Sequence, residues 1–255
     1  LTVYYDGKKM KLKKKIGEGT YGEVLLFTKG KYSIVIKKPF EDPYEEPYVI
    51  DKFLEKSGEC NHFIIPFKVV FDQHGNPFVI MQEANGDLVD LNLTNKLKEE
   101  VVKIMADFML CFYNKGLIYS DLKLENLLYK CEGDEISFFL GDIGSFSKIG
   151  KMNPSATHPP PETMDGGNHP NNLALGLYVF GATTAQLYDL DYQLYWKCPN
   201  KNRMKTKDEM RKTFYPKFKQ DVKKSTISPK MKNLILNFTN PNVSERLKYN
   251  FTDVK

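Results

Sequence analysis

Hydrophobic positions change their period about a third of the way along the chain. Before that point, short β-branched and aromatic runs at residues 21–27, 33–37 and 78–81 are bounded by Gly, Pro and Asn, which predicts strands. Residues 44–56 instead have helical spacing and end at a Ser-Gly pair. We therefore expect the first third to form a small antiparallel sheet with one helix.

The remainder of the chain has a helical pattern. Apolar residues between 101 and 112 recur three or four positions apart and stop at Lys115-Gly116, which predicts a helix with a glycine end. Further helices are expected near 173–190 and 230–238, with one strand at 137–140. This order predicts an α+β protein with two lobes joined near residues 83–86.

Composition adds a local charge to this picture. The 255 residues are 41% hydrophobic, which is enough for a large core and excludes a mainly disordered chain. The formal net charge is only +5, and the clearest excess of charge is the lysine run at residues 8–15. We interpret this run as a solvated strand face; nucleic acid, an anionic membrane or an acidic partner are the alternatives.

Cysteine usage indicates the compartment. The four cysteines are scattered without a C-x-x-C pair, so we expect reduced thiols, no zinc site and a cytoplasmic protein. Cys60 and His62 alone do not make a metal site. The long apolar stretch at 173–190 contains threonines, a glutamine and glycines, which predicts a buried helix and not a transmembrane segment.

A glycine-rich segment lies at the start of the first predicted strand, residues 21–27. Gly17, Gly19 and Gly22 form G-x-G-x-x-G, in which glycines let backbone N–H groups approach phosphate oxygens. The motif is followed by the strand-like residues 24–27, whereas a dinucleotide fold would place a helix there. The segment is therefore either a plain hairpin turn or a strand-loop-strand cover over phosphates.

Lys37 ends a β-branched strand. Because a strand alternates its faces, Val35 and Lys37 point the same way and offer an apolar wall and a charge for phosphate. An acidic partner is expected on the following helix. We choose Glu46, because apolar residues follow it at helical spacing. The other acidic residues of the helix remain open as partners: Glu45, Asp51 and Glu55.

The most informative stretch is residues 119–129. Within one loop, Asp121 supplies a base, Lys123 a charge for phosphate and Asn126 a metal ligand. Asp142 follows the strand at 137–140 and supplies a second oxygen ligand, as Mg²⁺ requires.

In residues 11–250 the chain resembles eukaryotic-type protein kinases. That family has a glycine-rich loop, V-A-I-K, H-R-D-L-x-x-x-N, D-F-G and A-P-E. The corresponding segments are residues 17–24, 34–37, 119–126, 142–144 and Pro160-Pro161-Glu162, and Arg246 matches the arginine that pairs with the last Glu. The resemblance implies a single two-lobed kinase domain over 1–255: an N-lobe sheet with one helix to about 82, a hinge at 83–86 and a mainly helical C-lobe from 87.

The resemblance also implies a nucleotide site. Adenine would lie between Ile16, Val24, Val35 and Leu128, with backbone bonds from Glu83 to Asn85 and either Met81 or Gln82 as gatekeeper. Lys37 would hold the α- and β-phosphates, Lys123 the γ-phosphate, and Asn126 and Asp142 the metal. The implied cofactors are ATP and Mg²⁺, with Mn²⁺ as the alternative metal.

Four departures from the family pattern bear on regulation. Tyr119-Ser120 replaces His-Arg, and the missing Arg would clamp a loop phosphate, so we expect activity without loop phosphorylation. Ile143 replaces Phe. Gly176 stands where we place the buried helix Asp of the family, five residues before Gly181. The segment from Asp142 to Glu162 is short.

We therefore expect a Ser/Thr protein kinase in which Asp121 orients the accepting hydroxyl, because Lys123 after Asp121 is typical of that branch. A pseudokinase scaffold that binds nucleotide or partners without turnover is the alternative, and a small-molecule kinase is a third. The expected partners are ATP and a protein substrate. Nucleic acid is not required, and the default state is a monomer without a transmembrane segment. The expected location is the cytoplasm, or the host cytoplasm for a viral or parasite protein.

Overall fold

The structure is a computed structural model that describes residues 2–19, 22–39, 58–71, 77–89, 91–152, 156–164, 168–190 and 206–254. The chain divides into two compact units. The first unit contains Leu1–Gly86 and Leu128–Gly144, and the second contains Asp87–Leu127 and Ser145–Lys255. In contrast to the continuous division expected from the sequence, residues 128–144 group with the first unit.

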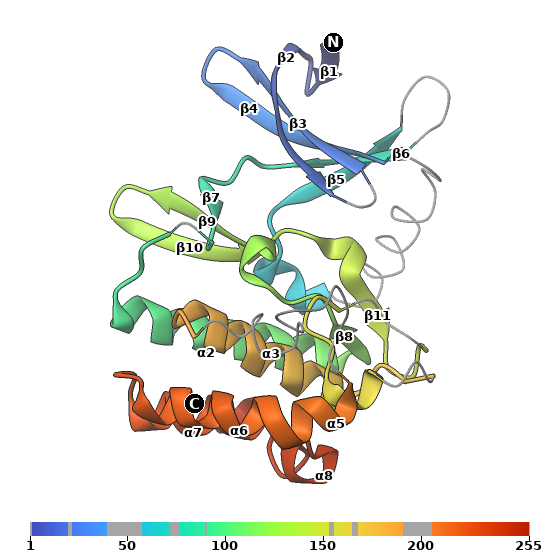
Figure 1. The fold of residues 1–255 in the computed structure, drawn as a ribbon. Helices are drawn as coiled ribbons and strands as arrows, with labels where there is room; N and C mark the ends of the chain where they lie inside the picture. The colour runs from blue at the N-terminus through green and yellow to red at the C-terminus, as the bar shows by residue number, and fades with distance from the viewer. Residues whose placement is uncertain are drawn as a thin grey trace. The chain divides into compact units, whose positions relative to one another are not determined.

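The first unit is built on one antiparallel sheet in the order β1-β2-β3-β4-β6-β5 (Figure 1). Its strands are β1 (Thr2–Tyr5), β2 (Lys8–Gly19), β3 (Gly22–Lys29), β4 (Tyr32–Pro39), β5 (Phe67–Phe71) and β6 (Pro77–Met81). The predicted strands at 33–37 and 78–81 are confirmed, and the strand predicted at 21–27 lies in β3 from Gly22 onward. The helix predicted at 44–56 lies outside the described residues.

Alternation along the strands buries one face of this sheet. Leu25 pairs with Ile36 and Phe27 with Ile34, and these four side chains form a cluster with Met10. Burial of such side chains is the main source of stability in a small unit.

The hairpin of β9 (Leu127–Glu132) and β10 (Glu135–Leu140) forms a second sheet with β7 (Gly86–Asp87). The Ile65 N–H donates to the Leu140 carbonyl at 2.9 Å, which connects the end of β10 to the chain after the 3-10 helix Gly58–Phe63. The hairpin thereby places Asp142, just past β10, in the first unit.

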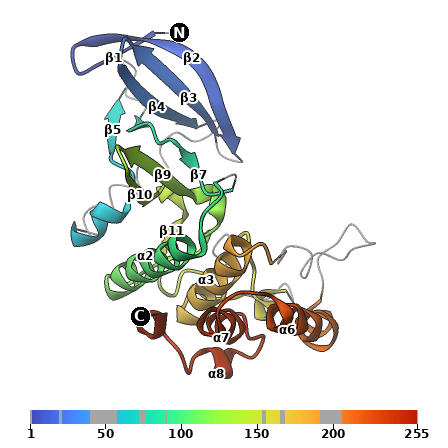
Figure 2. The same ribbon diagram turned by 90° about the vertical axis from the view of Figure 1, so that its left-hand side faces the viewer.

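The second unit is mainly helical, as predicted. Its principal helices are α2 (Asn95–Asn114), α3 (Leu173–Leu187), α6 (Tyr215–Lys224) and α7 (Pro229–Phe238), with the short helices α5 (Lys207–Glu209) and α8 (Val243–Arg246). A π-helical turn, Met210–Phe214, joins α5 to α6. α3 packs against α2 and α7 and is buried along nearly its whole length (Figure 2). It is thus the core helix expected at 173–190.

Local signals explain where α2 begins and ends. The Thr94 hydroxyl accepts a hydrogen bond from the Leu97 N–H at 3.3 Å and caps the first turn. At the other end Gly116 has φ 76°, a left-handed conformation that favours glycine. The predicted glycine end is confirmed.

Two short strands connect the helices to the candidate site. β8 (Leu117–Tyr119) pairs with β11 (Phe146–Lys148), and Tyr119 lies opposite Phe146 with ring centroids 4.7 Å apart. The tyrosine that replaces the family histidine is therefore a fully buried core residue.

Cysteines and membrane segments complete the comparison with the sequence. Cys60 and Cys111 are disulfide-bonded, so the expectation of four reduced thiols is wrong for these two, whereas Cys131 is free. Within the described residues, no helix combines the length and the apolar character that crossing a bilayer would need.

Candidate active site

In the first unit, Lys37 and Asp142 form an ion pair. Lys37 lies on β4, one residue past the buried Ile36 and on the same face as Val35. Its Nζ lies 3.0 Å from Asp142 Oδ1, and both side chains are mostly buried. The structure thus brings together two predicted site residues that are 105 positions apart. Charge-assisted hydrogen bonds of this kind are short and strong.

A glycine lets the chain pass close to Leu128 just before Asp142. A Cβ on Gly141 would lie 2.7 Å from Leu128 Cδ1, a distance that real contacts do not reach. Glycine at position 141 therefore leaves space for Leu128. Any side chain at 141 would displace Leu128, which is one of the predicted adenine contacts.

The glycine-rich segment is a hairpin between β2 and β3. Gly17 pairs with Val24 and Gly19 with Gly22, which confirms the strand-loop-strand arrangement and excludes the strand-loop-helix alternative. Ile16 lies next to a register shift of β2 and is 44% exposed. Thr20 and Tyr21 lie outside the described residues.

Backbone bonds fix the segment that was predicted as the hinge. The Gln82 N–H donates to the Pro66 carbonyl, and the Asn85 N–H donates to the Tyr129 carbonyl, each at 2.9 Å. The Asn85 N–H is therefore engaged within the chain, and the predicted backbone contacts of this segment with adenine stay a prediction. Of the two gatekeeper alternatives, Met81 is the Cα partner of Val35 in the sheet, which favours Met81 over the exposed Gln82.

In the second unit, Asp121 is the centre of a hydrogen-bonded cluster. It follows β8 and is only 8% exposed. Its Oδ2 lies 2.8 Å from Lys123 Nζ and accepts from Asn126 Nδ2 at 3.3 Å, while Asn126 Nδ2 also donates to the Asp121 carbonyl at 2.8 Å. Base, lysine and amide are therefore held together within one loop, as the sequence predicted.

Thr157 completes this cluster, and sequence reasoning missed it. Its N–H and its hydroxyl donate to Asp121 Oδ1 at 2.8 and 2.5 Å, and Lys123 Nζ donates to the same hydroxyl at 3.2 Å. The contact joins residues 36 positions apart, and its only signal in the sequence is a hydroxyl residue shortly before the Pro-Pro-Glu motif.

His158 lies beside the cluster and is almost fully buried. Burial lowers its pKa from 6.5 to about 4, against the opposing effects of the Asp121 charge and a hydrogen bond with Gln186. The ring is therefore neutral near pH 7, and the site gains no positive charge from it.

The catalytic loop is braced from α3 by a hydroxyl. Thr183 Oγ1 lies 2.8 Å from the Leu122 carbonyl, so a buried threonine supplies a brace that we did not predict. A Cβ on Gly176 would lie 3.2 Å from Ile118 Cδ1, a close approach to which the Ile118 side chain would have to adjust.

The buried polar residue near the start of α3 is Asn171. It lies five residues before Gly176, the same spacing as between Gly176 and Gly181, and it is completely buried and, unlike a glycine, able to form side-chain hydrogen bonds with β11. Asn171 Nδ2 donates to the Ser147 hydroxyl at 2.8 Å and to the Lys148 carbonyl at 3.2 Å, which fixes β11.

The predicted pair of Glu162 and Arg246 is confirmed. An Arg246 amino group donates to Glu162 Oε1, and its Nε donates to the Ala174 carbonyl at 2.8 Å. Arg246 is completely buried and its guanidinium lies 5.1 Å from the centroid of the Tyr178 ring. This arginine is a structural anchor between the Pro-Pro-Glu turn and α8.

The donor atoms of the predicted metal ligands suit Mg²⁺. Asn126 uses its amide nitrogen on Asp121, so its amide oxygen is the donor for a cation, and Asp142 supplies carboxylate oxygens. Neither belongs to a larger group, because the described residues contain no cluster of three His, Cys, Asp or Glu. Glu46 and its alternatives Glu45, Asp51 and Glu55 lie outside the described residues.

Comparisons with known proteins indicate the family of the chain. The family model described as "Protein kinase domain" matches residues 10–253. A probable serine/threonine-protein kinase 2 of Plasmodium falciparum is 26% identical over 152 residues, which are 56% of this chain and 30% of that protein. A probable serine/threonine-protein kinase of Dictyostelium discoideum is 28% identical over 85 residues, 31% of this chain and 6% of that protein. The chain thus spans less than a third of either relative.

Two solved structures share the fold. The kinase PK-1 of Cydia pomonella granulovirus has a TM-score of 0.63 at 19% identity, covering 96% of this chain and 92% of that one. The CAK complex of Chaetomium thermophilum bound to ATP-γ-S has a TM-score of 0.65 at 16% identity, covering 96% and 88%. At these identities the likeness concerns the fold alone.

Proposed function

Because this chain belongs to the protein kinase family, we propose that it transfers the γ-phosphoryl group of ATP to Ser or Thr hydroxyls of protein substrates. The observation that carries the proposal is the Asp121 carboxylate, which accepts a hydrogen bond from an aliphatic hydroxyl, that of Thr157, beside the ammonium of Lys123. An acceptor Ser or Thr presents the same chemical group.

The proposed reaction needs little covalent chemistry from the protein. The acceptor oxygen bonds to the γ-phosphorus while its proton passes to Asp121, and the bond from that phosphorus to the β–γ bridging oxygen breaks to release ADP. Lys123 offsets the charge of the transferred group, and Lys37 binds the remaining phosphates in exchange for Asp142. Asn126 in the second unit and Asp142 in the first unit each offer an oxygen donor that would suit Mg²⁺, which would neutralise phosphate charge. The name of the ATP-γ-S-bound relative supports ATP as the donor.

We also propose that the enzyme needs no phosphate on its activation segment. Ser120 stands where a phosphate-binding arginine would be, and β11 is already fixed by its pairing with β8 and by the Asn171 amide. The Gly150 N–H donates to the Asn171 carbonyl and the Asn171 N–H to the Lys151 carbonyl, both at 2.7 Å. These bonds fix residues 146–151 without an added charge.

A transfer assay tests the proposal. The chain is incubated with γ-labelled ATP, Mg²⁺ and a generic basic protein, and label on Ser, Thr and Tyr is separated by acid hydrolysis. Loss of a general base costs about 10²- to 10⁴-fold, so Asp121→Asn should abolish label on Ser and Thr. The matched control is Asp134→Asn, an exposed aspartate in the β9–β10 turn, which should retain full activity.

The replaced His-Arg pair favours a second function, that of a pseudokinase that binds without turnover. Nucleotide binding by both the wild type and Asp121→Asn, with neither transferring label in Mg²⁺ or Mn²⁺, would establish this alternative. Label on a small molecule in place of protein would instead indicate a small-molecule kinase.

A further inference from the structure

Positive charge is concentrated at the start of the first unit. Residues 2–39 carry ten lysines and three acidic residues, whereas the whole chain has a net charge of only +5. The rest of the chain therefore has more acidic than basic residues. Such asymmetry within one chain is typical of a surface that binds a polyanion.

Cross-strand pairing places part of this charge on one face of the sheet. Lys9 is opposite Tyr4 in β1, and Lys11 is opposite Thr28, which is itself opposite Ser33. Residues directly opposite each other in an antiparallel sheet share a face. The register beyond the bulge adds Lys14, opposite Leu26. We call the exposed or half-exposed members of this set the lysine face: Tyr4, Lys9, Lys11, Lys14, Thr28 and Ser33.

The two faces of β2 differ in how their lysines are paired within the described residues. On the opposite face, Lys8 lies 3.8 Å from Asp6 and Lys15 is paired with Glu18. Within the described part of the chain, no carboxylate lies within ion-pairing distance of the three lysines of the lysine face. Solubility alone does not require the paired and the unpaired lysines to lie on different faces of the strand.

An exposed aromatic ring lies among these charges. The Tyr4 side chain is 74% exposed and lies directly opposite Lys9. Lys9 and Lys11 are about 7 Å apart along β2, because alternate residues of a strand share a face. Aromatic rings beside a row of positive charges are the usual means of binding single-stranded nucleic acid, in which bases stack and phosphates contact lysines.

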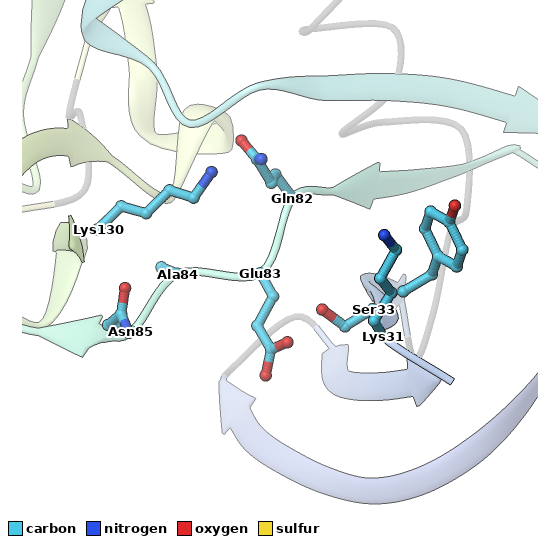
Figure 3. A pocket seen from close by; sticks show the side chains of 8 residues that line it. Lys31, Ser33, Gln82, Glu83, Ala84, Asn85 and Lys130 are labelled. Carbon is cyan, nitrogen blue, oxygen red and sulfur yellow. The ribbon is translucent and has the colours of Figure 1, made fainter. Parts of the chain in front are cut away.

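The lysine face leads to a pocket of about 520 Å³. Ser33 belongs to both, and the pocket is further lined by Gln82, Asn85, Glu83, Lys31 and Lys130 (Figure 3). In Figure 3, Lys31 and Lys130 lie on opposite sides of the backbone from Gln82 to Asn85. The pocket thus offers the Gln82 amide and the Glu83 carboxylate to the edge of a base and the Lys31 ammonium to phosphate. Lys130 is already paired with Glu132 at 2.8 Å, and Asn85 Oδ1 accepts from the Cys131 N–H at 2.8 Å.

We propose that the lysine face and this pocket bind single-stranded nucleic acid, with phosphates on Lys9, Lys11 and Lys14, one base on Tyr4 and another in the pocket. An acidic peptide fits less well, because a run of acidic residues has no aromatic base to stack on the exposed Tyr4 ring. A membrane fits less well because the lysine face has no exposed aliphatic side chain. A duplex would keep its bases from the ring.

The first experiment measures binding of a fluorescein-labelled 12-nucleotide oligouridylate by anisotropy between 50 and 200 mM salt. Three phosphate contacts predict a slope of about −2 for log affinity against log salt. The triple variant Lys9→Glu, Lys11→Glu, Lys14→Glu should lose about 100-fold in affinity at the lowest salt. The matched control, Lys96→Glu, Lys103→Glu, Lys219→Glu, makes the same charge change at exposed helix positions and should stay within about threefold.

The second experiment separates nucleic acid from other polyanions. Tyr4→Ala should weaken oligouridylate about tenfold, whereas Tyr4→Phe should retain the affinity of the wild type. Unfolding temperatures verify that all variants are folded. The proposal is overturned if the wild type does not bind, if both triple variants lose affinity equally, or if Tyr4→Ala has no effect. It is also overturned if a polyglutamate peptide or phosphatidylserine vesicles bind more tightly than the oligonucleotide. None of these outcomes depends on phosphoryl transfer.

Discussion

The two aspartates of the candidate site are held in different ways. Asp121, in the second unit, is 8% exposed and has Lys123, Asn126 and Thr157 as partners. Asp142, in the first unit, has a 32% exposed side chain, which contacts Lys37 and the Gly144 N–H. Because Asp121 is bonded on both oxygens it is preorganised for one role, whereas Asp142 is more exposed and makes both of these contacts through Oδ1, which suits the proposed role in cation binding.

The largest effect is expected at the buried anchor of the second unit. Arg246→Met leaves Glu162 without its buried partner, and breaking such a pair costs about 3 to 5 kcal/mol. In a chain of this size, we expect the unfolding temperature to fall by roughly 6 to 20 °C, measured by calorimetry. Arg211→Met, at an exposed arginine, is the control and should change it by only about 1 °C. Equal losses in the two variants would contradict the anchor role.

The next largest effect is expected on ATP affinity, which should depend on Lys37 and not on its neighbour Lys38. Lys37→Met removes a charged partner of the proposed phosphates, and a hydrogen bond to a charged group contributes about 1.5 to 3 kcal/mol. ATP affinity measured by calorimetric titration should therefore fall roughly 10- to 150-fold. Lys38→Met, whose side chain is 60% exposed on the other face of β4, should bind ATP like the wild type. If the two variants bound equally, Lys37 would not be a phosphate ligand.

A smaller effect is expected on the pH dependence of stability, through His158 in the second unit. The pKa of His158 is about 4 in the folded chain, below the usual 6.5 of histidine, so the unfolded chain binds the proton more readily. His158 therefore contributes stability above pH 6.5 that is lost as the pH falls toward 4. At pH 5 the loss is about 2 kcal/mol.

The measurement for His158 is unfolding by denaturant at pH 7 and pH 5. His158→Gln should remove most of the difference in stability between the two pH values. His62→Gln, at an exposed histidine, should leave the difference unchanged. An unchanged difference in His158→Gln would place the acid sensitivity elsewhere.

The smallest effect tests the close approach in the first unit. Gly141→Ala introduces a Cβ against Leu128, and overpacking at the end of a side chain should cost about 1 kcal/mol. The double variant with Leu128→Ala has room for the new methyl group. The double variant should therefore lose less unfolding free energy than the two single variants lose together, as measured by denaturant unfolding. Simple additivity would argue against the contact.

Most of the site could be predicted because its residues stand in ordered motifs. Lys37, Asp142, Asp121 and Asn126 follow strands or lie in one loop, and the structure brings Lys37 to Asp142 and Asn126 to Asp121. Their roles with ATP and metal stay predictions, as does the cytoplasmic location.

The rest could not be predicted, for identifiable reasons. The bonds of Thr157 and Asn171 join loops far apart in sequence, and a hydrogen bond between loops leaves no periodic pattern. The full length of β2 could not be predicted, because its register shifts at Lys13 and Ile16. These shifts break the alternation that identifies a strand. A period of two is visible only where the pairing is regular.

The hydrogen bond from the Thr157 amide to Asp121 offers a spectroscopic probe. The Thr157 N–H lies 2.8 Å from Asp121 Oδ1, so the chemical shift of that single proton responds to the charge on the carboxylate. Following this resonance through an acid titration would report the ionisation of Asp121 directly, without substrate and without a mutation at the aspartate itself.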